Sequence, residues 1–451
     1  MVHLLKSPLN TSLSQVRYFL PETLTSLPAE AFRTMWKAVG IDAWLAGRTS
    51  SLEDVRTAVT DIIGRVQNEG DAALFDLAKK HCVLTAIAVP DDEREDAYEK
   101  VDAKIIESLV EAHVRIERFH ELQKLRDLWL QEMEPGIVLG VKTTPLNRVG
   151  LYIPGGRAAY PSSALMCAVP ARVAGVKEIC ACSPPPINPL TLVALDIAGV
   201  TEIYNAGGAQ AVAAMALGTE SIRPVQKIVG PGNVYVTLAK MMLREKVEID
   251  FPAGPSEIGI IADETADPRI VAADILAQSE HDPHAACILI TTDKLLPAKV
   301  GREVEAMTKG APRREIIEQS LKNSGYVVVS TMEEAILASD AVAPEHLSIQ
   351  VADPISVVTR VKNAGAIFVG RYSAVACGDY AVGTNHVLPT AGYAKTYSGL
   401  DVNHFCKTAS VEMIDCEGLE TIGDIVETIA DAEGLHAHAE SVRVRRQIGR
   451  K

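Results

Sequence analysis

Apolar residues in the first part of the chain follow the spacing of amphipathic helices. Between Ser51 and Lys80 they share one helical face, with an interruption at Gly70, and they are Val55, Val59, Ile62, Ile63, Val66, Ala73, Leu74 and Leu77. A second helical block runs from about Asp92 to Arg126 and ends near a polar, charged linker. Short apolar patches in residues 1–45, separated by prolines and a glycine, predict a few short helices.

The pattern then changes to short apolar runs that alternate with alanine-rich stretches. We expect strands at 149–153, 178–182, 202–205 and 227–229, followed in turn by helices at 162–174, 190–198, 209–216 and 234–243. Strands and helices that alternate about every 25 residues are typical of βαβ units and a parallel sheet. This run therefore predicts one α/β unit.

A second run of the same kind begins at Glu257. It predicts strands at 258–261, 286–291, 326–330 and 366–369 and helices at 270–280, 299–308 and 332–339. We expect a separate α/β unit here, with the helices of residues 51–126 packed against it. The tail from Val402 is polar and helical, with a basic end. The predicted fold class is therefore α/β, with two Rossmann-like parallel-sheet domains plus small N- and C-terminal helical segments.

Composition restricts the class of protein and of partner. Of 451 residues, 47% are hydrophobic and 23% charged, as in ordinary globular proteins. The net charge of -14 argues against nucleic-acid binding, which requires a cationic surface. There is no apolar run of about 18 residues and no signal-peptide core, so we expect no membrane association and a cytoplasmic setting. The eight cysteines, scattered in mostly apolar sequence, indicate buried thiols in a reducing compartment.

Glycine-rich turns follow three of the expected strands of the first unit. They are Pro154-Gly155-Gly156, Gly207-Gly208-Ala209-Gln210 and Gly230-Pro231-Gly232-Asn233. Glycine at a strand-to-helix turn lets backbone N–H groups approach a phosphate, as in dinucleotide sites. The alternative is that tight turns of this kind need glycine in any case. Three such turns in one sheet favour a bound anionic cofactor.

Titratable chemistry is concentrated in the loop Gly378–Thr390. It holds Asp379 and His386 between glycines and a proline, which argue against a regular helix, and loops on rigid scaffolds often carry function. Two further polar clusters, Gln278–His281 and Pro344–Leu347, interrupt apolar sequence in the same half. Together they indicate a metal-dependent enzyme.

Several of these side chains are of the types that bind zinc. Gln278 and His281 share one helical face at the spacing i, i+3, and Asp379 would add a carboxylate. Near the C-terminus, His436 and His438 point to different faces of a helix, so at most one of them would serve a given site. The alternative is that a histidine near a helix end caps the helix or packs against it.

Glu345 and His346 stand next to each other at the start of an expected strand. A carboxylate and an imidazole can divide proton-transfer work, since the pKa of each can be tuned toward neutral pH. The alternative is a hydrogen-bonded pair in a loop. Cys377 could be a thiol nucleophile, but no cation lies just before it to lower its pKa, so this interpretation is not favoured.

Taken in this order, the segments resemble the histidinol dehydrogenase family over about residues 50 to 445. The resemblance rests on the motifs Val149–Gly156, Gly230–Asn233, Pro252–Glu257, Pro344–Leu347 and Gly378–Thr390. Members of this family oxidise L-histidinol to L-histidine through the aldehyde, in two NAD-dependent steps that end histidine biosynthesis. The resemblance therefore implies a zinc- and NAD-dependent alcohol and aldehyde oxidoreductase.

The resemblance also implies roles for individual residues. The zinc ligands would be Gln278, His281, Asp379 and His438. NAD would contact Tyr152, Gln210 and Asn233. The substrate would contact Ser256, His386 and Glu433, together with the zinc ligands and His346. His346 would be the base for both hydride transfers, and Glu345 would activate the water that hydrates the aldehyde.

The predicted domain organisation combines this resemblance with the pattern above. Residues 1–45 would form an N-terminal helical segment, and 46–151 with 258–398 a discontinuous α/β catalytic domain. Residues 152–257 would form an α/β NAD-binding domain, and 399–451 a C-terminal dimerisation segment. In the homodimer that the family forms, this segment would cross to the partner and complete its site with Glu433 and His438.

Two alternatives remain open from the sequence. One is a paralogous zinc- and NAD-dependent dehydrogenase of another small polar alcohol, such as a sulfonated propanediol. The other is a catalytically silent dimer kept for binding or regulation. The presence of Glu345, His346 and all four expected zinc ligands counts against the second alternative.

Overall fold

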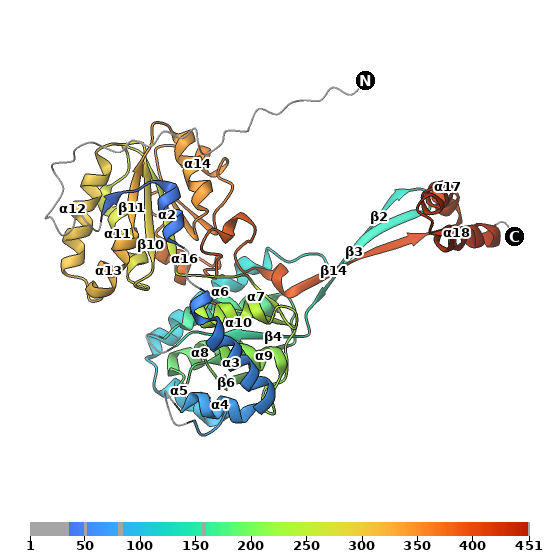
Figure 1. Ribbon diagram of the computed structural model, residues 1–451, viewed down its shortest axis with the longest axis horizontal. Coiled ribbons are helices and arrows are strands. Elements are labelled where there is room, and N and C mark those ends of the chain that lie inside the picture. Colours follow the sequence, from blue (N-terminus) through green and yellow to red (C-terminus); the bar gives the residue numbers. More distant parts are fainter. Residues whose placement is uncertain (1–35, 49–51, 80–83, 156–158, 450–451) are drawn as a thin grey trace.

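The structure, a computed structural model, describes residues 36–48, 52–79, 84–155 and 159–449. It has two α/β domains and an extended arm (Figure 1). Domain I comprises residues 53–121 and 148–249, domain II comprises 36–48 and 257–400, and the arm comprises 128–145 and 406–449. The predicted α/β class with two parallel sheets is confirmed. The helices expected in residues 1–35 lie outside the described residues.

Domain I is built on a parallel sheet of strand order β6-β5-β4-β7-β8. Its strands are β4 (Arg148–Tyr152), β5 (Glu178–Ser183), β6 (Glu202–Asn205), β7 (Lys227–Val229) and β8 (Glu248–Ile249). The crossover helices are α7 (Pro161–Val173), α8 (Pro189–Ile197), α9 (Gly208–Leu217) and α10 (Val234–Met242). β4 is buried throughout, as expected for a central strand with helices on both faces.

Four further helices cover domain I, against expectation. They are α3 (Glu53–Glu69), α4 (Asp71–Ala78), α5 (Asp91–Glu99) and α6 (Ala103–Glu121). Val59 of α3 packs in the core with residues of α9 and α10, and Ile116 of α6 packs with residues of α7 and α8. The prediction that these helices pack against the second α/β unit is therefore wrong. An amphipathic pattern shows that a helix has a buried face but does not show which core it faces.

Domain II has a six-stranded parallel sheet of order β1-β11-β10-β9-β12-β13. The strands are β1 (Lys37–Ala38), β9 (Glu257–Ala262), β10 (Ala286–Thr291), β11 (Gly325–Val328), β12 (His346–Gln350) and β13 (Ala366–Val369). The helices are α2 (Ile41–Gly47), α11 (Pro268–Ser279), α12 (Leu296–Lys309), α13 (Arg314–Ser320), α14 (Met332–Val342), α15 (Pro354–Val358) and α16 (Val375–Tyr380). Every residue of the central strands β9, β10 and β12 is buried.

Residues 36–48 belong to domain II rather than to a separate helical segment. Trp36 is fully buried, and its indole N–H donates to the carbonyl of Pro297 at 3.0 Å. β1 pairs in parallel with β11 at one edge of the sheet. The expected helix is present as α2, but the edge strand before it was not expected.

The arm extends away from both domains (Figure 1). It consists of an antiparallel sheet of order β14-β3-β2, with strands β2 (Leu128–Glu134), β3 (Ile137–Pro145) and β14 (Cys406–Ile414). It ends in helices α17 (Cys416–Ala432) and α18 (His436–Gly449). The tail was expected to be helical throughout, and the stretch after Arg126 to be a linker, so the three strands are a correction. Every residue of β2 is exposed, and its apolar run, Leu128–Leu130, is shorter than the run that predicts a buried strand.

Within the described ranges, no helix is both long enough and apolar enough to cross a membrane.

Candidate functional site

A cavity of 1980 Å³ lies between the two domains. Domain I contributes the turns that follow β4, β6 and β7, and domain II contributes residues near the ends of β9, β12 and α16. In parallel α/β sheets, ligands bind outside the carboxyl ends of the strands, which is where the three turns of domain I lie. The cavity is therefore the candidate active site.

Glu345 is buried between the ends of two central strands. It precedes β12, and its Oε2 accepts a hydrogen bond of 2.8 Å from the backbone N–H of Glu257 at the start of β9. Burial raises the pKa of the Glu345 carboxyl well above its usual range, and the nearby carboxyls of Glu257 and Asp379 raise it further. A carboxylate with a raised pKa is a stronger base than an exposed one.

His346 presents one bare ring nitrogen. Its Nδ1 donates to Oε1 of Gln278 at 3.1 Å, while its buried Nε2 has no hydrogen-bond partner within the described residues. Nε2 lies 3.8 Å from Oδ1 of Asp379, and the edge of the ring faces Phe368 with 5.7 Å between centroids. Burial lowers the pKa of His346 to about 3, so the imidazole is neutral. The open nitrogen is positioned to accept a proton from a bound ligand.

Three of the four expected zinc ligands gather near this nitrogen. Gln278 is buried in the last turn of α11, and its Nε2 has no hydrogen-bond partner among the described groups. His281 follows the end of α11 and lines the cavity with Asp379. Burial raises the pKa of the Asp379 carboxyl to about 7. Among the described residues, no group of three or more His, Cys, Asp or Glu side chains is arranged to hold a metal ion.

His386 is held by groups from both domains. Its Nδ1 donates to the backbone carbonyl of Asp379 at 2.9 Å, and its Nε2 accepts from the hydroxyl of Ser163 on α7 at 3.1 Å. Burial lowers the pKa of His386 to about 4, so this ring is neutral as well. His386 therefore lies at the wall of the cavity in a fixed orientation.

The loop that carries His386 is anchored on domain I. The side-chain amide of Asn385 donates to the carbonyl of Met166 at 2.7 Å and lies 3.3 Å from Nε2 of His120. Gly383 adopts φ +109°, and a Cβ there would lie 2.5 Å from the carbonyl oxygen of Arg115. Only glycine fits this close approach, so the glycine in the loop is required by packing.

On the other wall, the expected cofactor residues lie along the glycine-rich turns. The Tyr152 hydroxyl accepts from the backbone N–H of Gly208 at 3.1 Å, and Gln210 lies in the first turn of α9. Oδ1 of Asn233 caps α10 by accepting from two backbone N–H groups at 3.0 and 3.2 Å. Only the amino end of this amide thus remains for a ligand.

A buried ion pair holds the turn after β7, Gly230–Asn233, in place. Lys240 pairs with Asp250, and both side chains are at most 5% exposed. Lys240 donates to the carbonyl of Gly230 at 3.1 Å, and Asp250 accepts from the backbone N–H of Gly230 at 2.8 Å. At φ +116°, a Cβ on Gly230 would lie 2.1 Å from the carbonyl oxygen of Tyr152. This glycine therefore has a packing role as well.

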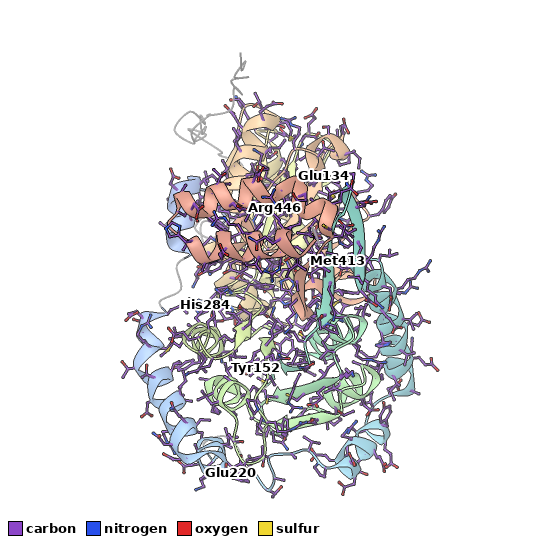
Figure 2. The ribbon with its side chains drawn as sticks, turned by 90° about the vertical axis from the view of Figure 1, so that its right-hand side faces the viewer. Glu134, Tyr152, Glu220, His284, Met413 and Arg446 are labelled. Atoms are coloured by element: carbon purple, nitrogen blue, oxygen red, sulfur yellow. The ribbon has the colours of Figure 1, made fainter. Side chains whose placement is uncertain are left out.

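Ser256 joins the same cavity, but the two residues expected from the C-terminal segment do not. Ser256 precedes β9 and hydrogen-bonds to Glu345. Glu433 and His438 are exposed on the arm, which lies apart from the cavity in the same chain (Figure 1). Figure 2 shows the end of the arm, with Arg446 on its terminal helix and Glu134 and Met413 on its strands. The structure thus brings together all expected site residues except these two.

Comparison with known proteins agrees with this geometry. The family model described as histidinol dehydrogenase matches residues 46–446. The chain belongs to the histidinol dehydrogenase family. It is 49% identical over 407 residues to the histidinol dehydrogenase of Methanosarcina barkeri, a match that covers 89% of this chain and 94% of the relative. With the enzyme of Geobacillus kaustophilus the identity is 46% over 407 residues, covering 89% and 96%.

A solved structure supports the same assignment. The crystal structure of histidinol dehydrogenase from Elizabethkingia anophelis superposes with a TM-score of 0.88 at 38% identity. The match covers 92% of this chain and 98% of the other. The chain is thus an oxidoreductase of the histidinol dehydrogenase family, and the alternative of a paralogue for another alcohol is not favoured.

Several residues of the site could not be found from the sequence. Ser163, Asn385 and His120 hold the loop of His386, and Arg48 and Glu257 lie behind Glu345. Glu257 stands at the end of the motif Pro252–Glu257 as an acidic residue before an apolar strand, which is a usable signal. No local spacing marks the others, since their partners lie far away in sequence.

Proposed function

We propose that this protein oxidises L-histidinol to L-histidine through the aldehyde, in two NAD-dependent steps at a zinc site. The observation that carries the proposal is the buried Glu345–His346 pair, with its bare Nε2 beside Asp379 in the cavity between the domains. A base and a candidate metal ligand within 3.8 Å of each other suit the removal of a proton from a substrate hydroxyl held beside His346, and a metal held by Asp379 would polarise that hydroxyl.

The donor atoms near this pair fit a zinc ion. Gln278, His281 and Asp379 offer oxygen and nitrogen atoms, and a cation would stabilise the charge of the buried Asp379 carboxylate. His438 would supply the fourth ligand. When bound, zinc would orient and polarise the substrate, while NAD would accept the hydride.

The two catalytic residues have separate tasks. His346 would take the proton from the substrate hydroxyl in the first step and from the hydrated aldehyde in the second. Gln278 would keep Nε2 of His346 free to accept a proton. The hydrogen bond from Nδ1 of His346 to Oε1 of Gln278 fixes the ring proton on Nδ1. Glu345 would take a proton from the water that hydrates the aldehyde. His386 and Ser256 would contact the substrate.

The cofactor would lie against the turns of domain I. Tyr152, Gln210 and Asn233 line that wall of the cavity, and backbone N–H groups at the turns can approach a pyrophosphate. The free amino end of Asn233 would be its donor to the cofactor. Closing the aldehyde into a cavity between two domains would also prevent the loss of a reactive intermediate.

The site would be completed by a second copy of the chain. The arm exposes large apolar side chains on its strands and helices, which is unusual for a surface that faces water. They include Leu128, Trp129, Met133, Met413, Ile425, Ile429 and Leu435. A homodimer that buries this surface would bring Glu433 and His438 of each arm to the cavity of the other subunit.

The stoichiometry of NADH formation tests the proposal. The purified protein with added zinc should form two NADH for each L-histidinol consumed, with L-histidine as the product. A sulfonated propanediol under the same conditions should give none. One NADH per histidinol, or reduction of NAD only with the diol, would contradict the proposal. Chelation should stop the reaction and zinc should restore it.

A further inference from the structure

Arg48 is a cation at the wall of the cavity with a largely buried side chain, and the reaction described above has no role for it. It caps the C-terminus of α2, and its guanidinium stacks on the ring of Trp44 at 4.6 Å from the centroid. One amino group pairs with the carboxylate of Glu257, and the other donates to the carbonyl of Val342 at 3.0 Å. The side chains of Arg48 and Glu257 are only 9% and 3% exposed. Charges are buried in this way only when paired.

Both partners of Arg48 are close to Glu345, one through a hydrogen bond and the other along the chain. The backbone N–H of Glu257 donates to Oε2 of Glu345 at 2.8 Å. Val342 is the last residue of α14 and is followed by Ala343, whose left-handed backbone (φ 49°) turns the chain toward Glu345. Such a conformation costs a residue with a Cβ free energy and persists only where its surroundings hold it. Arg48 thus holds the two segments that fix the position of the Glu345 carboxylate.

The charges of Arg48, Glu257 and Glu345 also connect Arg48 with Glu345. Glu257 and Glu345 are two carboxylates buried next to each other, and the charge of Arg48 acts on both. Without a cation, two adjacent buried carboxylates cannot both be ionised.

We propose that Arg48, acting through Glu257 and the turn at Val342–Pro344, is a positioning residue for the step in which Glu345 activates water. The inference rests on the proposed function, in which Glu345 serves the hydration of the aldehyde. In that step a C–O bond forms between water and the aldehyde carbon and the carbonyl π bond breaks. One proton of the water passes to Glu345, which then gives that proton to the former carbonyl oxygen, so that the hydrate forms and Glu345 returns to its starting state.

The aldehyde itself separates this step from the rest of the chemistry. With NAD, aldehyde that binds in its carbonyl form must be hydrated in the site before it is oxidised to the acid. With NADH, the same enzyme reduces the aldehyde to the alcohol without using water. The ratio of these two rates therefore reports on hydration, while damage to folding, cofactor binding or hydride transfer lowers both.

The experiment compares wild-type protein with Arg48→Met, Arg48→Lys and Glu257→Gln, using L-histidinal as substrate. Arg48→Met should lower the rate of oxidation at least about tenfold more than the rate of reduction, because a misplaced base mainly affects the step it serves. Arg48→Lys should recover part of the ratio, since it keeps the charge but cannot reach both partners. Glu257→Gln keeps its backbone N–H but loses the ion pair and should show the same selective loss.

Arg56→Met is the matched control. Arg56 lies on α3 with a side chain that is 48% exposed, and its partner is Glu53. This variant should keep the wild-type ratio. If Arg48→Met does not yield folded protein, the ratio of the oxidation rate to the reduction rate in Arg48→Lys and Glu257→Gln tests the proposal. Equal loss of both rates, or an unchanged ratio in these variants, overturns the role of Arg48. If wild-type protein forms no NADH from L-histidinal, the proposed function fails instead.

Discussion

The cavity and the arm carry residues of one expected site in opposite settings. In the cavity, Glu345, His346 and Gln278 are buried, and hydrogen bonds between β9, α11 and the start of β12 fix their orientation. On the arm, Glu433 and His438 face solvent beside exposed apolar side chains. The cavity is preorganised by its own chain, whereas the arm residues have no comparable surroundings within the described part of this chain. This difference is what the proposed division of the active site between two subunits requires.

The largest effect is expected inside the cavity. His346→Gln removes the bare ring nitrogen and should lower kcat about 10²- to 10⁴-fold, the usual contribution of a general base. His284→Gln, an exposed histidine at the same cavity, is the control and should retain activity. Steady-state rates of NADH formation measure both. Similar kcat values for the two variants would remove His346 from the mechanism.

On the arm, a side chain that is exposed in the single chain should still be needed for zinc binding and activity. His438→Ala should reduce zinc affinity and activity by about 10- to 100-fold or more, because a metal ligand is lost. His436→Ala, two residues away and paired with Asp431 at 2.9 Å, should bind zinc normally. Metal analysis of the purified variants makes the comparison. Unchanged zinc content in His438→Ala would contradict the assignment of this ligand.

Ion pairs should differ between the two regions in their contribution to stability. Lys240→Met leaves Asp250 buried without its cation and should cost about 3–5 kcal/mol in the free energy of unfolding. Arg443→Met on the arm breaks contacts with Glu427 and Asp431, but solvent screens these charges. Its unfolding midpoint in urea should shift much less. A larger shift for Arg443→Met would mean that the arm is more buried in solution than in a single chain.

The apolar surface of the arm predicts how dimer formation can be broken. Ile429→Asp introduces a charge at a side chain that is 54% exposed, and it should shift sedimentation from dimer toward monomer. Ile355→Asp, at a side chain 63% exposed on domain II, should leave the dimer intact. Both variants sedimenting as wild type would place the subunit contact elsewhere.

The smallest effect concerns pH and the rim of domain I. The Arg148 guanidinium, with smaller contributions from Tyr204 and Arg223, lowers the pKa of Glu202 to about 2. A depressed carboxyl pKa adds stability that is present above the unfolded pKa of about 4.3 and is lost as the pH falls toward 2. Glu202→Gln should therefore have a lower melting temperature than wild type at neutral pH. The difference between the two melting temperatures should disappear as the pH falls from about 4.3 toward 2. A difference in melting temperature that does not change with pH would show that ionisation of Glu202 contributes nothing to stability.

The same contrast explains what the sequence could predict. β9 and β10 are mostly apolar and buried on both faces, so their runs of isoleucine and leucine indicated central parallel strands. The exposed strand β14 of the arm has no such run. Its packing depends on β3 and β14, which lie far apart in the chain, and on a surface that no local pattern describes.

The candidate site follows the same rule. Glu345 and His346 are neighbours in sequence, so residue types and spacing pointed to them. Asp379 and His386 are close in sequence as well, although Asp379 lies in the last turn of α16 rather than in the loop that was expected to include it. Arg48 lies 209 residues from Glu257, and Asn385 lies 265 residues from His120. These contacts arise only when helices and strands pack, so the residues that hold the site could not be recognised from local spacing.

Mixed dimers test the division of the site most directly. His281→Ala damages the cavity and His438→Ala damages the arm, so each homodimer should be inactive. In purified heterodimers, one cavity keeps both its own ligands and an intact arm from the partner, and about half of the wild-type activity should return. Heterodimers as inactive as the two parent variants would contradict an active site built from two chains.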